Sequence, residues 1–115
     1  MRARLLLFAA VFAAVTVAGS AWAGTLSEKA ALAAAVAILQ GDPYGDTPAE
    51  VTANIVDRRL GPRRDTVCHG GDTPVWAFRV VIPHPKSNPD GRIDGWLVID
   101  ARKGEIVCAN LPFLN

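Results

Sequence analysis

The chain has 115 residues, with 12 Lys and Arg against 11 Asp and Glu, and its formal net charge at neutral pH is +1. This length predicts one small domain. The near-neutral charge excludes a binding mode carried by electrostatics, such as binding to nucleic acid or to an anionic membrane surface.

The N-terminal segment has the layout of a secretory signal peptide. Arg2 and Arg4 form a short basic region, and residues 5–18 are almost all apolar. Ala21 and Ala23 then supply the small residues of an A-x-A cleavage site. The apolar run is shorter than the roughly 20 residues that a spanning helix needs, so cleavage is favoured over a retained membrane anchor.

We therefore expect residues 24–115 to form one exported domain, either periplasmic or secreted, after cleavage near Ala23. No stable membrane anchor is expected once the segment is removed. Cleavage removes two arginines and no acidic residue, which leaves the processed chain with a formal net charge of −1.

Two cysteines, Cys68 and Cys108, lie in the processed chain. An even number of cysteines in an exported protein predicts a disulfide. Closing a loop of about 41 residues is worth roughly 4 kcal/mol in the chain-entropy description. The alternative is a catalytic thiol paired with His69, but adjacent residues of an extended segment point to opposite faces, which argues against such a pair.

Two helices are expected after the signal segment. The first covers residues 29–40, with Thr25 as its N-cap and Gly41 at its end. Its apolar residues form two stripes, one of large and one of small side chains: Leu32, Val36 and Leu39, and Ala30, Ala33 and Ala37.

The second helix is expected over residues 48–60, with Thr47 as N-cap and Pro48 at the first helical position. Gly61 and Pro62 end it, and the two helices form a hairpin. Four arginines cluster at this predicted helix end. They are Arg58, Arg59, Arg63 and Arg64. Such a cluster fits a site for a phosphate or an acidic partner, but it also fits the ordinary preference of cations for a helix C-terminus. We favour the second interpretation.

Three strands follow, over residues 75–82, 93–100 and 105–109. The first two runs alternate with period two and are rich in β-branched and aromatic residues. The face with Trp76 and Phe78 is expected to meet the helices. The face of the second strand with Asp94 and Trp96 is the wetter one. The predicted fold class is α+β, with two N-terminal helices packed on one face of a three-stranded antiparallel β-meander and one disulfide.

The run G-W-L-V-I-D-A-R-K-G-E-I-V, preceded by W-A-F-R-V, resembles the PepSY module. The recurrent pattern of that family is a helix, a strand that starts with an aromatic residue, and a strand that ends in Asp-Ala-x-x-Gly-x-Val. The residues that carry the resemblance are Asp100, Ala101, Gly104, Glu105 and Val107, of which Val107 lies one residue beyond the Val position of the pattern.

This resemblance covers about the last forty residues and the first helix; the second predicted helix and the cysteine pair are not part of the usual pattern. It implies an envelope or secreted module, which in some members is part of the inhibitory propeptide of thermolysin-like metallopeptidases. The helix–helix–strand order also resembles, more weakly, the fold shared by the β-lactamase inhibitor protein and small outer-membrane-assembly lipoproteins. Neither resemblance supplies a catalytic residue.

No catalytic motif is found, so the chain is not expected to be an enzyme. His69, Asp72 and His84 are candidates for a metal site, but the two histidines flank opposite ends of the first strand, about 35 Å apart at ~3.3 Å per residue. Neither a metal nor another cofactor is therefore expected.

A non-catalytic protein-binding or peptidase-inhibitor-like module is the function that we expect, with an envelope or secreted protein such as a peptidase as partner. Its contact residues are expected to be Trp96, Phe113 and Leu114. The alternatives are a structural or stress-related envelope protein without a dedicated partner, and a carrier of a small ligand or metal. An exposed apolar patch of several hundred Å² would favour the binding module.

Overall fold

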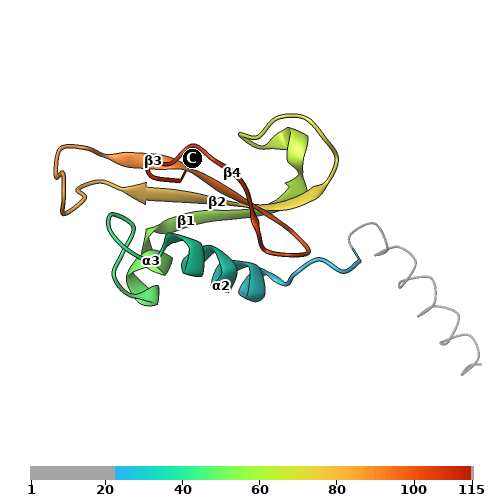
Figure 1. Cartoon of the computed structure of the whole chain (residues 1–115), viewed down its shortest axis with the longest axis horizontal. Coiled ribbons are helices and arrows are strands. Elements are labelled where there is room, and N and C mark those ends of the chain that lie inside the picture. Colours follow the sequence, from blue (N-terminus) through green and yellow to red (C-terminus); the bar gives the residue numbers. More distant parts are fainter. Residues whose placement is uncertain (1–22, 115) are drawn as a thin grey trace, which may run out of the picture.

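A computed structural model describes residues 23–114; the predicted signal peptide, apart from Ala23, lies outside this range. The described chain is an α+β domain in which two helices cover one face of a four-stranded antiparallel sheet with the order β1-β2-β3-β4 (Figure 1). Its helices and strands are α2 (Glu28–Leu39), α3 (Pro48–Asn54), β1 (Ile55–Pro62), the 3₁₀ helix η2 (Arg63–Asp65), β2 (Pro74–Ile82), β3 (Ile93–Asp100) and β4 (Ile106–Ala109).

The first helix lies within one residue of its predicted position, but its cap and its small-residue stripe were predicted wrongly. Ser27, not Thr25, is the N-cap, and its hydroxyl accepts a hydrogen bond of 3.1 Å from the Ala30 amide. The alanines that face the core are Ala31 and Ala35, which have no exposed surface. Those of the predicted stripe are exposed, namely Ala30, Ala33 and Ala37.

The second helix was predicted too long. α3 begins as expected, with the Thr47 hydroxyl accepting from the Glu50 amide at 3.2 Å, but it ends at Asn54. The Asn54 side-chain amide donates to the Tyr44 carbonyl at 3.0 Å, and the β-branched residues Ile55 and Val56 continue as a strand. The sheet therefore has four strands. The prediction of a three-stranded meander is wrong because it did not include β1.

The two faces of the sheet carry separate apolar clusters. The helix side holds the main core, in which the predicted face of β2 packs on α2 and α3: Trp76, Phe78, Val80 and Ile82 are all at most 7% exposed. The other side holds a smaller cluster built on Val75, Ala77 and Val98, against which Cys68 and Cys108 pack. The disulfide therefore belongs to the side that the helices leave open.

The C-terminal segment continues from β4 along β3. Asn110 and Trp96 exchange two hydrogen bonds, from the Asn110 amide to the Trp96 carbonyl at 3.1 Å and from the Trp96 amide to Asn110 Oδ1 at 2.6 Å. Leu111 is then buried in the main core. The Tyr44 hydroxyl donates to the Pro112 carbonyl, which ties the end of the chain to the turn between the two helices.

Residues 100–104 build the turn between β3 and β4. The Asp100 carboxylate accepts from the Arg102 and Lys103 amides, each at 2.8 Å, and the Gly104 amide donates to the Asp100 carbonyl at 2.8 Å. Gly104 has a φ of 74°, which an L-residue with a side chain rarely adopts. The Asp-x-x-x-Gly spacing thus has a local structural reason, as the sequence predicts.

Candidate functional site

The open face of the sheet carries a groove of about 700 Å³. One wall is the last part of β1, and the other is the segment after η2 that the disulfide holds to β4. Trp96 from β3 and Ala77 from β2 lie between them. We call this feature the Trp96 groove; its lining residues are Arg59, Leu60, Gly61, Pro62, Asp65, Thr66, Val67, His69, Ala77, Trp96 and Asn110.

Sheet register explains why Trp96 lies in the groove. Trp96 pairs with Arg79 on β2, and the next β2 residue on that face is Ala77, which is opposite Arg59 on β1. Because Ala77 is small, the indole can lie over β2 and reach β1. There the Arg59 guanidinium stands over the ring at 5.3 Å from its centroid, within the range of a cation–π contact.

Arg59 is held in this position by its neighbour Asp57. The Arg59 Nε atom donates to Asp57 Oδ2 at 2.8 Å, and its Nη2 atom lies at the same distance from that oxygen. The Arg59 side chain is still 69% exposed. A cation that is ordered by one carboxylate and accessible to solvent can bind a carboxylate or carbonyl oxygen of a ligand.

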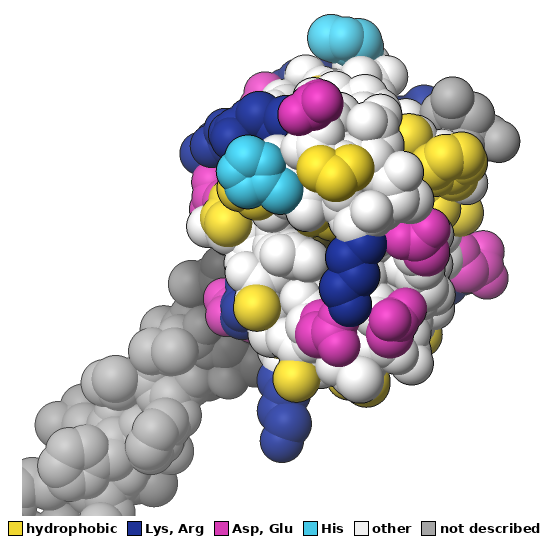
Figure 2. Space-filling model, turned by 90° about the vertical axis from the view of Figure 1, so that its left-hand side faces the viewer, with side chains coloured by type: hydrophobic (Ala, Val, Ile, Leu, Met, Phe, Trp, Pro, Cys, Tyr) yellow, Lys and Arg dark blue, Asp and Glu magenta, His cyan; other side chains and the backbone are white. Residues whose placement is uncertain are grey.

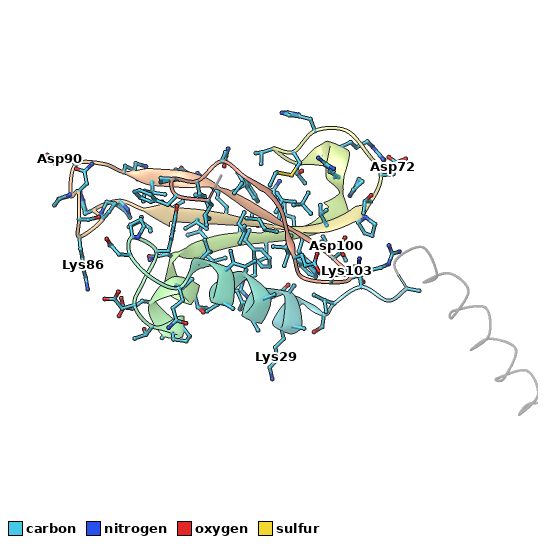
Figure 3. All side chains as sticks on the ribbon, viewed as in Figure 1. Lys29, Asp72, Lys86, Asp90, Asp100 and Lys103 are labelled. Carbon is cyan, nitrogen blue, oxygen red and sulfur yellow. A yellow bond between two sulfur atoms is a disulfide. The ribbon has the colours of Figure 1, made fainter. Side chains whose placement is uncertain are left out.

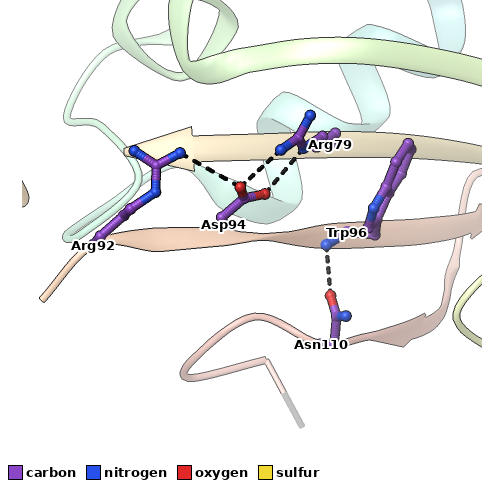
Figure 4. A network of polar contacts seen from close by, with 5 residues as sticks. All are labelled: Arg79, Arg92, Asp94, Trp96 and Asn110. Atoms are coloured by element: carbon purple, nitrogen blue, oxygen red, sulfur yellow. Dashed lines mark hydrogen bonds and ion pairs between the residues drawn. The ribbon is translucent and has the colours of Figure 1, made fainter. Parts of the chain in front are cut away.

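The outer end of the same face carries an ion-pair network beside Trp96 (Figure 4). Arg79 donates to Asp94 through two hydrogen bonds, at 3.0 Å from Nε and 2.8 Å from Nη2, and Arg92 approaches Asp94 at 3.5 Å. The hydrogen bonds from Arg79 lower the pKa of Asp94, and the same bonds raise the pKa of Arg79. The network keeps one face of the Trp96 strand charged and solvated.

The wall after η2 is built by local hydrogen bonds and by the disulfide. The Thr66 hydroxyl donates to the Arg63 carbonyl at 2.7 Å and accepts from the Cys68 amide at 3.2 Å. Cys68 is bonded to Cys108, with 5.8 Å between their Cα atoms. The predicted disulfide is thus present.

Structural roles also occupy the polar groups that would serve as nucleophiles in this groove. The Thr66 hydroxyl is engaged in the turn, and both cysteines are in the disulfide. His69 lies at the wall with a φ of 57° and an exposed side chain. The arrangement offers an aromatic surface, a guanidinium and one carboxylate, which are groups that can bind a ligand.

The other predicted site residues are not gathered at the groove. Phe113 is 84% exposed but does not line it, and Leu114 packs against the main core on the opposite side of the sheet. His84 lies in a second, smaller hollow of about 140 Å³, apart from His69. Within residues 23–114, no group of three or more His, Cys, Asp or Glu side chains is placed to hold a metal ion.

The sequence predicts Trp96 as a contact residue and places Arg59 in a cluster of arginines at a helix end. Because β1 was expected to be helical, the position of Arg59 over Trp96 and the β1 wall were not predicted. The period-two alternation of Asp57 and Arg59 on one side with Arg58 and Leu60 on the other was the available signal.

Comparison with known protein families, with curated proteins and with solved structures found no match to this chain. Among the described residues, no helix is both long and apolar enough to cross a membrane.

Proposed function

We propose that this chain is an exported, non-catalytic protein-binding module of the PepSY type, which acts in the periplasm or outside the cell. Its site is the Trp96 groove, and its expected partner is another envelope or secreted protein, with a peptidase as the leading candidate. The signal-like N-terminus, the disulfide and the Asp-x-x-x-Gly turn support this assignment.

The observation that carries the proposal is the half-buried Trp96 ring beneath Arg59 in a groove with a covalently held wall. Tryptophan and arginine are the side chains most enriched among residues that dominate binding energy at protein interfaces. Since the Asp57 contact and the disulfide already order the groove, a ligand loses little affinity to the ordering of the site.

An extended segment of the partner fits this groove best. An apolar side chain would lie against Trp96 and Val67, and a carboxylate of the same segment would approach Arg59. The surface at the end of the molecule that holds the loop between β2 and β3 differs from the Trp96 groove, because charged side chains of both signs are interspersed there with apolar ones (Figure 2).

Selection from a displayed peptide library against the disulfide-intact domain tests the proposal. The affinity of each selected peptide is then measured by calorimetry for the wild type, Trp96→Ala and Phe113→Ala. We expect Trp96→Ala to weaken binding at least roughly tenfold, since removal of a central aromatic anchor commonly costs more than 1–2 kcal/mol. Phe113→Ala is the matched control, because this aromatic side chain is exposed and outside the groove.

Peptides that bind both variants equally would show that the groove is not the site. The peptidase part of the proposal has its own readout, which is inhibition of a thermolysin-like metallopeptidase by the wild type and its loss in Trp96→Ala. Binding without inhibition would support the protein-binding function and would contradict the peptidase-inhibitor function.

One observation favours a small-ligand carrier as the second candidate. A groove of about 700 Å³ has the size of many small-molecule sites, which commonly span about 300–1,000 Å³. A carrier would bind small aromatic or anionic compounds with Trp96-dependent affinity and would yield no selected peptide, so the same two variants distinguish the candidates.

A further inference from the structure

The outer edge of β1 is a second surface, independent of the groove ligand, and its chemistry is self-complementary. Among the described strands, β1 pairs with β2 alone and forms one border of the sheet (Figure 1). Val56 and Leu60 are two of the large apolar residues that the domain exposes, at 55% and 38%. They lie two residues to either side of Arg58.

The direction of the β1 backbone groups follows from the register. The Pro74 carbonyl of β2 accepts from the Ala101 amide and therefore points toward β3. In an antiparallel ladder, successive residues point to alternate sides. Val75, Ala77 and Arg79 consequently point toward β1, and their β1 partners point back toward β2.

Arg58 and Leu60, which alternate with those partners, therefore direct their amide and carbonyl groups away from the sheet. The Arg58 amide has a side chain as its partner, since it donates to Asp57 Oδ1 at 2.8 Å. The Arg58 carbonyl and the Leu60 amide and carbonyl also point outward, where another strand can pair with them.

We propose that this edge pairs with the same edge of a second copy of the chain, antiparallel about a two-fold axis at Arg58. This register places Asp57 opposite Arg59 of the second copy and Leu60 opposite Val56 of the second copy. A register centred on Asp57 or Arg59 would pair that residue with its own counterpart and would form no ion pair between Asp57 of one copy and Arg59 of the other. Of these three registers, the one centred on Arg58 is the one that pairs opposite charges.

The like charges that meet at the axis are already compensated. Arg58 lies on the helix side of the sheet, and its Nη1 atom is 3.3 Å from Glu28 Oε2 of the same chain. The paired segment is also bounded at both ends. The bulge between Ile55 and Asp57 bends one end, and Pro62 has no amide to donate at the other.

Bulges, charges and prolines on edge strands normally discourage pairing with arbitrary strands. In this register the same charges become cross-strand ion pairs, so the edge is selective for its own copy. The two copies would form one continuous sheet with both Trp96 grooves on the same face.

Sedimentation equilibrium of the processed, disulfide-intact chain tests this proposal. The wild type is expected to dimerise. Asp57→Arg places two cations opposite each other at both ends of the pairing, and Arg59→Asp places two anions there. Each variant alone is expected to weaken dimerisation at least roughly tenfold. An equimolar mixture of the two restores both ion pairs and is expected to form a heterodimer.

Two charge-matched controls are available in the loop between β2 and β3, at the end of the molecule where Figure 3 labels Lys86 and Asp90. Lys86→Asp and Asp90→Arg change the net charge as Arg59→Asp and Asp57→Arg do, and both are expected to dimerise like the wild type. Leu60→Pro removes one outward amide without touching a bond to β2, and it is expected to be a folded monomer by circular dichroism.

A wild type that remains monomeric up to about 1 mM would overturn the proposal. So would a dimer that Leu60→Pro leaves intact, or a mixture of the two charge variants that fails to associate. Peptide binding in the Trp96 groove is a separate measurement. If no peptide binds there, the mass measured by sedimentation still decides whether the chain dimerises.

Discussion

Tyr44 shows at the residue scale how a single buried hydroxyl ties the end of the chain to the domain. It is 3% exposed, and its hydroxyl donates to the Pro112 carbonyl. Burial raises the pKa of Tyr44 from 10.0 to about 12. Because the folded pKa is the higher one, the stabilisation is fully present below pH 10.0 and is lost as pH rises through about 12.

We expect the absorbance of tyrosinate to appear near pH 12, or when the domain unfolds, and not near pH 10. Tyr44 is the chain's one tyrosine, so the titration reports on it alone. Tyr44→Phe should cost about 1 kcal/mol at neutral pH, by leaving the Pro112 carbonyl without its donor, and should abolish the loss of stability between pH 10 and 12. Ionisation at pH 10 in the folded protein would contradict the buried position.

At the scale of elements, the crossing of β3 by the C-terminal segment depends on Gly95. A Cβ atom at this position would lie 2.7 Å from the Asn110 carbonyl oxygen and 2.9 Å from Leu111 Cδ2, which is closer than real contacts allow. Gly61 in β1 is another glycine within a strand, and a Cβ atom there would meet nothing within 4 Å.

Gly95→Ala is therefore expected to destabilise the domain by about 1–3 kcal/mol, because the tail must move off the sheet. Gly61→Ala should be neutral or slightly stabilising, since it reduces the freedom of the unfolded chain. Urea unfolding of both variants measures the difference. Equal stabilities would mean that the tail does not pack over β3.

The elements with strong alternation or local chemistry could be predicted from the sequence, and β1 could not. β2, β3 and α2 were placed within about one residue, because the period of their apolar residues fits one structure only. Val51, Ile55, Val56 and Leu60 fit both a helix and an edge strand. Pairing with β2 decides between the two, and that information is not local.

The candidate site was predictable only in part for the same reason. Trp96 could be assigned to the face away from the helices from alternation alone. The groove also needs Arg59 and the segment after η2, which come together through the register of β1 and the disulfide.

At the scale of the whole molecule, the sheet separates a helix-covered core from a disulfide-covered cluster. The disulfide closes a sequence separation of 40 residues, and loops of this length are worth roughly 4 kcal/mol. Reduction is therefore expected to lower the melting temperature by roughly 10 °C or more.

Thermal unfolding with and without a phosphine reductant measures this effect. The double variant Cys68→Ser with Cys108→Ser is the control, because it should melt like the reduced wild type and should not respond to the reductant. A wild-type melt that is unchanged although mass spectrometry finds two free thiols would show that the crosslink contributes nothing to stability.

The order β1-β2-β3-β4 has a consequence for how the chain assembles. Each strand pairs with the strand that comes next in the chain, so the sheet can form by successive hairpins whose ends are close in sequence. Such local topologies fold quickly, since little loop entropy is lost before contacts form. Cys108 lies in the last of these strands. The noncovalent sheet can therefore bring both thiols together before oxidation. The disulfide then stabilises a contact between Cys68 and Cys108 that strand pairing has already formed.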